Sequence, residues 1–199
     1  MSEIKFFNRW DNQGVVITDP GLVNYIETQP VIIPKTGGRN AKFRFHKSKM
    51  TIVERFMNRI MIPGHKNKKH FQSSGSKTGK SQTILHIMEN MLDIIEQKTK
   101  ENPIAVLVQA IVNAAPREEI IAIEYGGARY PKAVECAPQR RIDLVIRYMT
   151  QGASQKAFNT KKSIEQALAD EVLHAYNLSS SSAAIAKKNE FERQADSSR

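Results

Sequence analysis

The 199-residue sequence has a single cysteine, Cys136, and no long apolar run. One cysteine excludes a disulfide within the chain and indicates a reducing compartment. Free cysteine usually packs as a small apolar residue, so we expect Cys136 to be buried. No apolar stretch approaches the roughly 20 residues that cross a bilayer, and the N-terminus has no cleavable signal. We therefore expect no membrane association.

The sequence also lacks the residue patterns that are typical of catalysis. Its acids are scattered, and it has no paired-carboxylate spacing, nucleophile motif or Cys/His cluster. His65 and His70 are spaced as in some metal sites, but no acid or cysteine accompanies them, so we expect surface histidines in a basic loop. The sequence predicts neither an enzyme nor a metal site.

The stretch GSKTGKSQT, which begins at Gly75, resembles a phosphate-binding loop without meeting its requirements. That motif needs Gly, four residues and Gly-Lys-Ser/Thr after a buried strand. Only three residues separate Gly75 from Gly79, and Ser74 stands where the first glycine is required. The preceding HKNKKHFQSS is too polar for a central strand. A nucleotide-dependent enzyme using Lys80 and Ser81 is the weaker alternative, and the same lysines suit a loop that clamps RNA backbone.

Positive charge is concentrated in one block of the sequence. The net charge is +10, yet Lys35 to Lys80 alone has thirteen Lys or Arg against one acid, Glu54, while the rest has 17 bases and 19 acids. A solvated surface normally mixes its signs, so this block predicts a polyanionic partner, with nucleic acid ahead of anionic lipid.

Two phenylalanines alternate with the bases of this block. Phe43 and Phe45 lie within TGGRNAKFRFHKSK, which has no apolar period. Cations interleaved with aromatics favour phosphate contact and base stacking. The alternative is a flexible connector whose phenylalanines pack into the core.

The dipeptide Gly126-Gly127 predicts a tight hairpin turn, because glycine readily adopts positive φ. Two turn residues fix the register, which places Glu124 opposite Arg129 and Ile123 opposite Tyr130. One pair has opposite charges and the other joins a β-branched to an aromatic side chain. Both kinds of pair stabilise a ladder.

The hairpin is expected at about 119–136, with Pro131 making its second strand an edge. Free hairpins are only marginally stable, which leaves two arrangements. The hairpin folds onto the helices as ordinary core, or it projects as an arm that completes itself against a partner. Ribbons that enter nucleic-acid grooves favour the arm.

Apolar periodicity predicts six helices, and the last has few apolar residues, so we expect it to need a neighbour. Thr51 and Ser163 have capping-box spacing to Glu54 and Gln166. The fourth helix is expected to turn Ile142, Val145, Ile146 and Met149 inward and Arg140, Arg141 and Arg147 outward. The expected helices are 51–61, 83–98, 103–115, 138–148, 163–176 and 183–196.

We therefore predict a mainly α fold: a bundle of about six helices, a protruding two-stranded antiparallel β-hairpin and an extended basic N-terminal segment. The expected units are an N-terminal extension with a basic RNA-contacting arm at 1–50, a helical domain with the hairpin at 51–178, and a C-terminal helix and tail at 179–199.

The chain contains, in order, GGRNAKFRFHKSKMTIVERFMNRIM, NPIAVLVQAIVNAAPREE, GGARY, AVECAPQRRID, KKSIEQALADEVLHA and AIAKKNEFERQADSSR. Together these resemble the universal small-subunit ribosomal protein seven family, called protein five in eukaryotes. IKFFNRW and DPGLVNYI are similar to the N-terminal extension of the archaeal and eukaryotic branch. Pro131, Cys136, Gln139 and the long segment 65–78 depart from the family pattern.

The resemblance implies a structural constituent of the small ribosomal subunit, located in the cytoplasm. It would bind the 3′ major (head) domain of small-subunit ribosomal RNA and nucleate head assembly. The hairpin and C-terminal end would line the exit-site transfer RNA and the messenger RNA exit region, near a platform protein of the eleven family. We expect no homo-oligomer and no cofactor beyond RNA-associated magnesium.

The residues expected to contact ribosomal RNA are basic. They are Arg39, Lys42, Arg44, Lys47, Lys49, Lys66, Lys68, Lys69, Lys77, Lys80, Arg140 and Arg141. The hairpin residues expected beside transfer and messenger RNA are Gly126, Gly127, Arg129 and Tyr130. Binding would be largely electrostatic, with little base readout. A helix-turn-helix DNA regulator is a further alternative, which would need dimer symmetry and a preference for duplex DNA.

Overall fold

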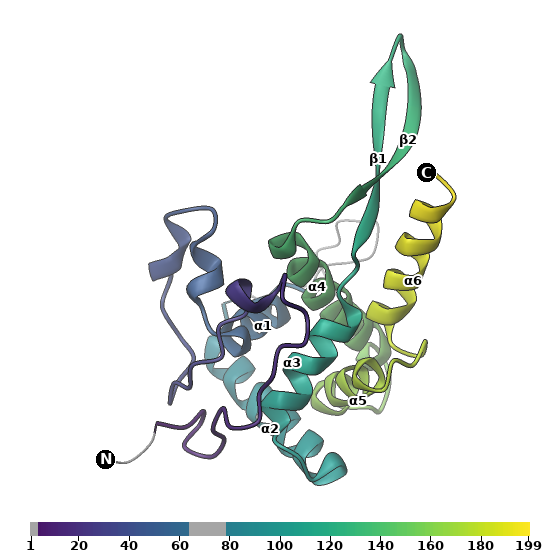
Figure 1. Cartoon of the computed structure of the whole chain (residues 1–199). Coiled ribbons are helices and arrows are strands. Elements are labelled where there is room, and N and C mark those ends of the chain that lie inside the picture. The colour runs from purple at the N-terminus through teal and green to yellow at the C-terminus, as the bar shows by residue number, and fades with distance from the viewer. Residues whose placement is uncertain (1–3, 64–78) are drawn as a thin grey trace.

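The computed structural model describes residues 4–63 and 79–199, and this part of the chain forms a helical body with one projecting hairpin (Figure 1). The helices are α1 (Ile52–Met61), α2 (Ser81–Thr99), α3 (Pro103–Ala114), α4 (Pro138–Ala157), α5 (Ile164–Tyr176) and α6 (Ala183–Asp196). The strands are β1 (Glu118–Tyr125) and β2 (Ala128–Glu135). The predicted mainly α architecture with a two-stranded antiparallel hairpin is confirmed.

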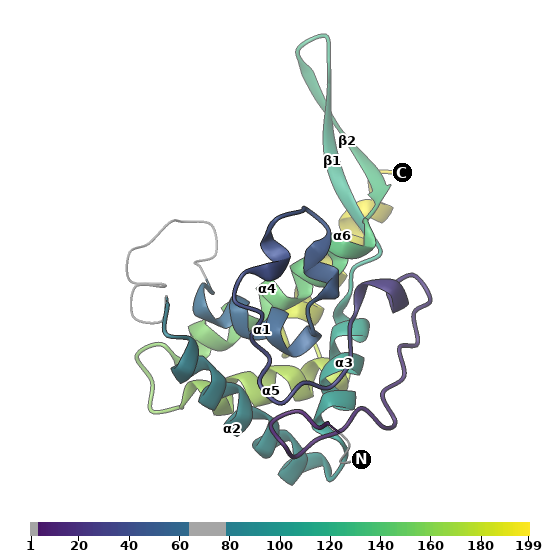
Figure 2. The same ribbon diagram turned by 90° about the vertical axis from the view of Figure 1, so that its left-hand side faces the viewer.

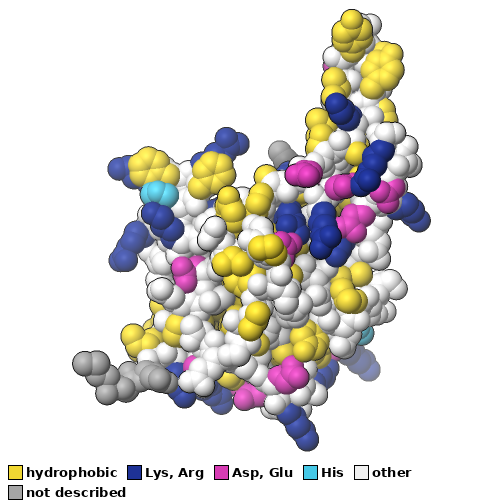
Figure 3. All heavy atoms as spheres, in the orientation of Figure 1, with side chains coloured by type: hydrophobic (Ala, Val, Ile, Leu, Met, Phe, Trp, Pro, Cys, Tyr) yellow, Lys and Arg dark blue, Asp and Glu magenta, His cyan; other side chains and the backbone are white. Residues whose placement is uncertain are grey.

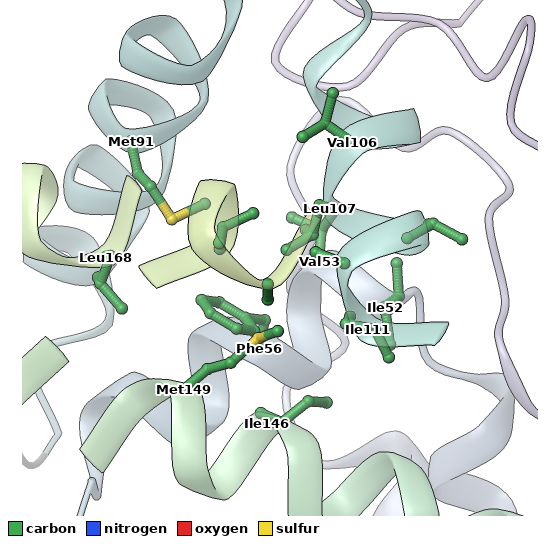
Figure 4. Packing of buried hydrophobic residues seen from close by; sticks show 14 of the residues in the cluster. Ile52, Val53, Phe56, Met91, Val106, Leu107, Ile111, Ile146, Met149 and Leu168 are labelled. Atoms are coloured by element: carbon green, nitrogen blue, oxygen red, sulfur yellow. The ribbon is translucent and has the colours of Figure 1, made fainter. Parts of the chain in front are cut away.

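The core lies where α1 to α5 converge. Phe56 of α1 is fully buried and lies close to Met149 of α4, with Met91 and Leu107 contributed by α2 and α3 (Figure 4). All six apolar positions of α2 with helical spacing are buried, as the sequence pattern predicts. Within the described residues, no helix is long and apolar enough to span a membrane.

The fourth helix is longer than predicted. It continues past Tyr148 to Ala157, because Met149, Thr150 and Ala153 are buried and extend the apolar face of the helix. Gly152 within this stretch made a break plausible, since glycine is a poor helix former. Packing against α5 outweighs that preference.

The N-terminal segment lies across the body and supplies part of the core (Figure 2). Phe6 and Leu22 are fully buried, and Trp10 donates a hydrogen bond from Nε1 to Glu96 of α2 at 3.0 Å. Just before α1, residues 35–50 form two short 3-10 turns, Arg39–Ala41 and His46–Lys49. We call residues 35–50 the basic lobe. It lies at the same end of the molecule as the hairpin (Figures 1 and 2).

The hairpin has the predicted register. Glu124 faces Arg129 and Ile123 faces Tyr130, with both turn glycines at positive φ. Most of its residues are exposed, which confirms a projecting arm and excludes the folded-back arrangement.

Pro131 continues β2 without interrupting it, opposite Ala122. Tyr125 and Ala128 flank the two-residue turn and form a hydrogen-bonded pair in hairpins of this kind. Hydrogen-bonded and non-hydrogen-bonded pairs alternate along an antiparallel ladder. The Ala122–Pro131 pair, three steps away, is therefore non-hydrogen-bonded, so proline removes no ladder donor.

Both predicted helix caps are present. The Thr51 hydroxyl accepts the Glu54 N–H at 3.3 Å, and the Ser163 hydroxyl accepts the Gln166 N–H at 3.3 Å. The carboxylate of Glu54 is used elsewhere, because its Oε1 accepts two hydrogen bonds from Thr36. The first cap therefore also connects the basic lobe to α1.

Helix α6 packs against α4 and β1, so it has the neighbour that its sparse apolar content requires. Its N-terminus is held by Glu171, a fully buried acid of α5 that accepts hydrogen bonds from Ser182 (2.8 Å) and Lys156 (2.8 Å). At the other end, Arg199 pairs with Glu118 at the base of the hairpin.

Cys136 is buried at the end of the hairpin, as predicted. Burial, reinforced by the nearby carboxylate of Glu119, raises the pKa of the Cys136 thiol to about 11. The thiol is therefore neutral at pH 7 and behaves as an apolar group.

Candidate nucleic-acid interface

The basic lobe presents exposed cations at its surface. Arg39, Lys42, Arg44 and Lys49 are exposed, and none forms an ion pair with a described residue. A mixed surface would pair such charges with acids. These four are therefore available to an anionic partner.

The two phenylalanines of the lobe are exposed. Phe43 is 56% and Phe45 62% accessible, so the alternative that they pack into the core is wrong. The Phe43 ring lies 4.6 Å from the His46 ring, and Lys42 Nζ lies 5.5 Å from the Phe43 centroid. Rings and basic side chains lie side by side on the lobe (Figure 3), which is an arrangement suited to stacking and phosphate contact.

Contacts of Thr36, Lys47 and Ser48 anchor the lobe to α1 and α4. Thr36 donates to Glu54 of α1 through its N–H (2.8 Å) and its hydroxyl (2.7 Å). Lys47 pairs with Asp143 of α4, and the Ser48 hydroxyl hydrogen-bonds to Gln139 at the start of α4. The lobe is thus fixed at both ends, and its free cations keep a defined position.

Asp143 joins the lobe to both helices. It accepts hydrogen bonds from Lys47 and from Arg55, whose Nη2 lies 2.8 Å from Oδ1. Burial opposes the charged form of Asp143, but these two hydrogen bonds outweigh it and lower its pKa below the ordinary value. Lys47 therefore has a structural partner in addition to its expected contact with RNA.

The two arginines at the foot of the hairpin have different surroundings. Arg140 is exposed and forms a bidentate pair with Glu119 of β1 at 2.7 Å. Arg141 is buried, donating to Asp19 Oδ2 (2.6 Å) and to the Pro116 carbonyl (3.0 Å). The prediction that Arg141 lies on the outer face of its helix is wrong, because the N-terminal segment covers that face.

The hairpin tip is open to solvent. Tyr125 is 80% and Tyr130 57% exposed, and Arg129 lies 3.7 Å from Glu124 across the strands. Gly126 and Gly127 have φ of 60° and 82°, the left-handed region that favours glycine. The tip thus presents two aromatic rings and one partly paired cation.

Several predicted site residues lie outside the described part of the chain. They are Lys66, Lys68, Lys69 and Lys77, together with the two histidines His65 and His70. Lys80 is described, is exposed, and occupies the N-cap position of α2. Within the described ranges, no three metal-binding side chains come together.

Sequence reasoning did not combine Arg59 of α1 with Arg147 of α4. Burial and the neighbouring charge of Arg147 lower the pKa of Arg59, and its Nε has no hydrogen-bond partner among the described residues. Two like charges held together attract an anion. Arg59 lies in the positively charged block from Lys35 to Lys80, and this position is the sequence feature that could have identified it as a candidate site residue.

The sequence model of the family described as ribosomal protein S7p/S5e matches residues 23–199. The chain belongs to the ribosomal protein S7p/S5e family. Residues 23–199 include the basic lobe, the hairpin and all six helices named above, so family membership covers every part of the interface.

Archaeal members of the S7p/S5e family are similar over nearly the full length. Small ribosomal subunit protein uS7 of Nanoarchaeum equitans is 51% identical over 197 residues, which are 99% of this chain and 100% of that protein. The proteins of the same name from Methanosphaera stadtmanae and Archaeoglobus fulgidus are 46% and 44% identical. Both alignments cover at least 97% of this chain and at least 96% of the relative.

The S7p/S5e family consists of structural ribosomal proteins, and this member is accordingly a structural protein and not an enzyme. The resemblance inferred from the sequence motifs, to this family and to its archaeal and eukaryotic branch, is confirmed. The GSKTGKSQT stretch, which resembles a phosphate-binding loop, therefore belongs to a structural ribosomal protein and not to a nucleotide-dependent enzyme.

Proposed function

We propose that this chain is a structural constituent of the small ribosomal subunit and binds the 3′ major (head) domain of small-subunit ribosomal RNA, nucleating assembly of the head. The observation that carries the proposal is the anchored basic lobe. Four of its exposed cations, Arg39, Lys42, Arg44 and Lys49, form no ion pair with a described residue, and two exposed rings lie among them. Membership of a ribosomal family supports RNA as the polyanion.

The RNA surface would extend from the lobe onto the helices. Arg59 and Arg147 continue the positive charge across α1 and α4, and Arg140 adds to it at the foot of the hairpin. Arg141 would contribute indirectly, because it holds the N-terminal segment against the start of α4 through Asp19. Such contacts would follow the shape and phosphates of folded RNA.

The projecting hairpin would line the exit-site transfer RNA and the messenger RNA exit region. Its exposed Tyr125 and Tyr130 suit stacking on unpaired bases. Helix α6 and Arg199 lie beside the hairpin base, where a platform protein of the eleven family would bind. The protein would then act in the ribosome, in the cytoplasm, without a cofactor of its own.

Binding of the purified full chain to a transcript of the head domain tests this function. An unrelated structured RNA of equal length, duplex DNA and a fluorescent nucleotide with magnesium serve as competitors. We expect tight binding to the head-domain transcript that weakens steeply between 50 and 200 mM salt, about 10³-fold or more for six or more phosphate contacts. Equal affinity for both RNAs, or a preference for duplex DNA, would contradict the proposal.

Co-sedimentation with small ribosomal subunits provides the second measurement. We expect the chain to remain with the subunits through a high-salt wash, because many contacts must break together. Loss of the chain under conditions that keep other subunit proteins bound would contradict a structural role.

A further inference from the structure

A cavity of about 490 Å³ lies between the basic lobe, α1 and the start of α2. Its walls include the apolar side chains of Met50, Met57, Met61 and Ile84. Cavities of this size hold small organic groups, which such sites bind by apolar walls and a few placed polar atoms.

One buried polar atom beside this cavity has no hydrogen-bond partner among the described residues. Glu54 lines the cavity and is only 4% exposed. Its Oε1 accepts both hydrogen bonds from Thr36, whereas Oε2 accepts none from the described residues. A buried carboxylate oxygen without a donor is costly, so it indicates a ligand that supplies N–H groups.

The surroundings of Glu54 favour one class of ligand. Lys35, Arg44 and Lys47 line the same cavity, and Phe43, which is largely exposed, forms another part of its lining. A rim of cations attracts phosphate and repels a lysine or arginine side chain from a partner protein. Gly37 also lines the cavity, and a Cβ there would meet no atom within 4 Å.

We propose that this cavity holds one unstacked nucleobase of the RNA strand, and that the Glu54 carboxylate turns Oε2 toward the cavity to accept hydrogen bonds from the amino edge of that base. The inference rests on the proposed function and adds a base-specific contact to it. Apolar walls would cover the base faces, and the rim cations would hold the adjoining phosphates. Guanine, with adjacent N1–H and N2–H donors, fits a carboxylate best, whereas uracil places carbonyl oxygens on both sides of its single N–H.

The cavity methionines make the test site-specific. The full chain, labelled with ¹³C at methionine methyl groups, is titrated with the RNA pentanucleotides UUGUU and UUUUU. We expect UUGUU to shift the Met50, Met57 and Met61 signals and to bind about tenfold more tightly than UUUUU. The core residues Met88, Met91 and Met149 do not line the cavity, so their signals are the internal control.

The variant Glu54→Gln tests the acceptor. Glutamine keeps one oxygen for Thr36 and places a donor where Oε2 was, so the preference for UUGUU should disappear or reverse. Glu165→Gln on α5, outside the cavity, should retain it. Unchanged Met88, Met91 and Met149 signals show that the variant is folded. Phe43 is exposed, so Phe43→Ala leaves the core intact. This variant should weaken the binding of UUGUU at least threefold if Phe43 covers the base.

Three results would overturn the inference. The first is equal affinity of the two pentanucleotides for the wild type, and the second is an unchanged preference for UUGUU in Glu54→Gln. The third is a shift of the cavity methionine signals by a lysine-rich peptide when neither pentanucleotide shifts them. If these occur while head-domain RNA still binds tightly, the proposed function stands and only the base pocket fails. If head-domain RNA does not bind at all, the proposed function fails first.

Discussion

Arg141 Nη2 lies 2.6 Å from Asp19 Oδ2, although 122 residues separate the two along the chain. Both side chains are largely buried, and the pair holds the N-terminal segment against the start of α4. The hydrogen bond from Arg141 lowers the pKa of Asp19. An arginine that family resemblance assigns to RNA therefore has a structural partner within the protein.

Replacing Arg141 with methionine should destabilise the free protein. The change leaves the Asp19 carboxylate largely buried without its partner, and the free energy of unfolding should fall by about 3 kcal/mol. Urea denaturation measures this. The exposed Arg147→Met is the matched control and should change stability by less than about 0.5 kcal/mol. Unchanged stability of Arg141→Met with lost RNA affinity would instead assign Arg141 to the RNA surface.

Neutralising single lobe cations should reduce the salt dependence of RNA binding. Lys42→Gln and Arg44→Gln each remove one exposed cation, so each should lower the slope of log affinity against log salt by about 1. Arg9→Gln is the control, because Arg9 pairs with Asp93 on α2. Equal slopes for all three variants would show that the lobe does not contact phosphate.

Asp143 should make stability depend on acid pH. Its pKa is lower in the folded chain than in the unfolded one, so its contribution is present above the ordinary value of 3.8 and is lost as pH falls through the folded pKa. Urea titrations between pH 2 and 7 measure the effect. Asp143→Asn should be less stable than the wild type at pH 7 and lose less on acidification. Parallel pH profiles for the two proteins would refute the assignment.

Gly152 should not tolerate a side chain. A Cβ at this position would lie 2.7 Å from Ala183 Cβ and 3.3 Å from Glu171 Cδ. We expect Gly152→Ala to reduce the free energy of unfolding by about 1–3 kcal/mol through overpacking at the start of α6. Adding Ala183→Gly should recover part of the loss, since the two sites are in contact. Strictly additive losses in the double variant would exclude this clash as the cause.

Local pattern was sufficient for the elements that depend on neighbouring residues. The register of the hairpin follows from Gly126-Gly127, and the caps at Thr51 and Ser163 follow from residues three positions away. The buried positions of α2 follow from helical spacing. These features need no knowledge of the rest of the fold.

Pairings that join distant segments could not be predicted in this way. Arg141 has helical spacing typical of an outer face, yet the N-terminal segment covers it. Asp143 accepts hydrogen bonds from Lys47 of the lobe and Arg55 of α1. Glu171 accepts a hydrogen bond from Ser182, which lies beyond the end of α5. In each case tertiary packing determines the partner, and the periodicity of a single sequence carries no information about which distant segments pack together.

The anchors of the basic lobe also bear on the order of events during synthesis. Lys47 pairs with Asp143, which lies 96 residues further along the chain, and Ser48 hydrogen-bonds to Gln139, which lies 91 residues further along. On a polypeptide growing from its N-terminus, the thirteen-cation block therefore emerges well before α4 can fix the lobe in place. Attraction to RNA would thus begin while the lobe is still undocked, and the lobe would reach its final conformation afterwards.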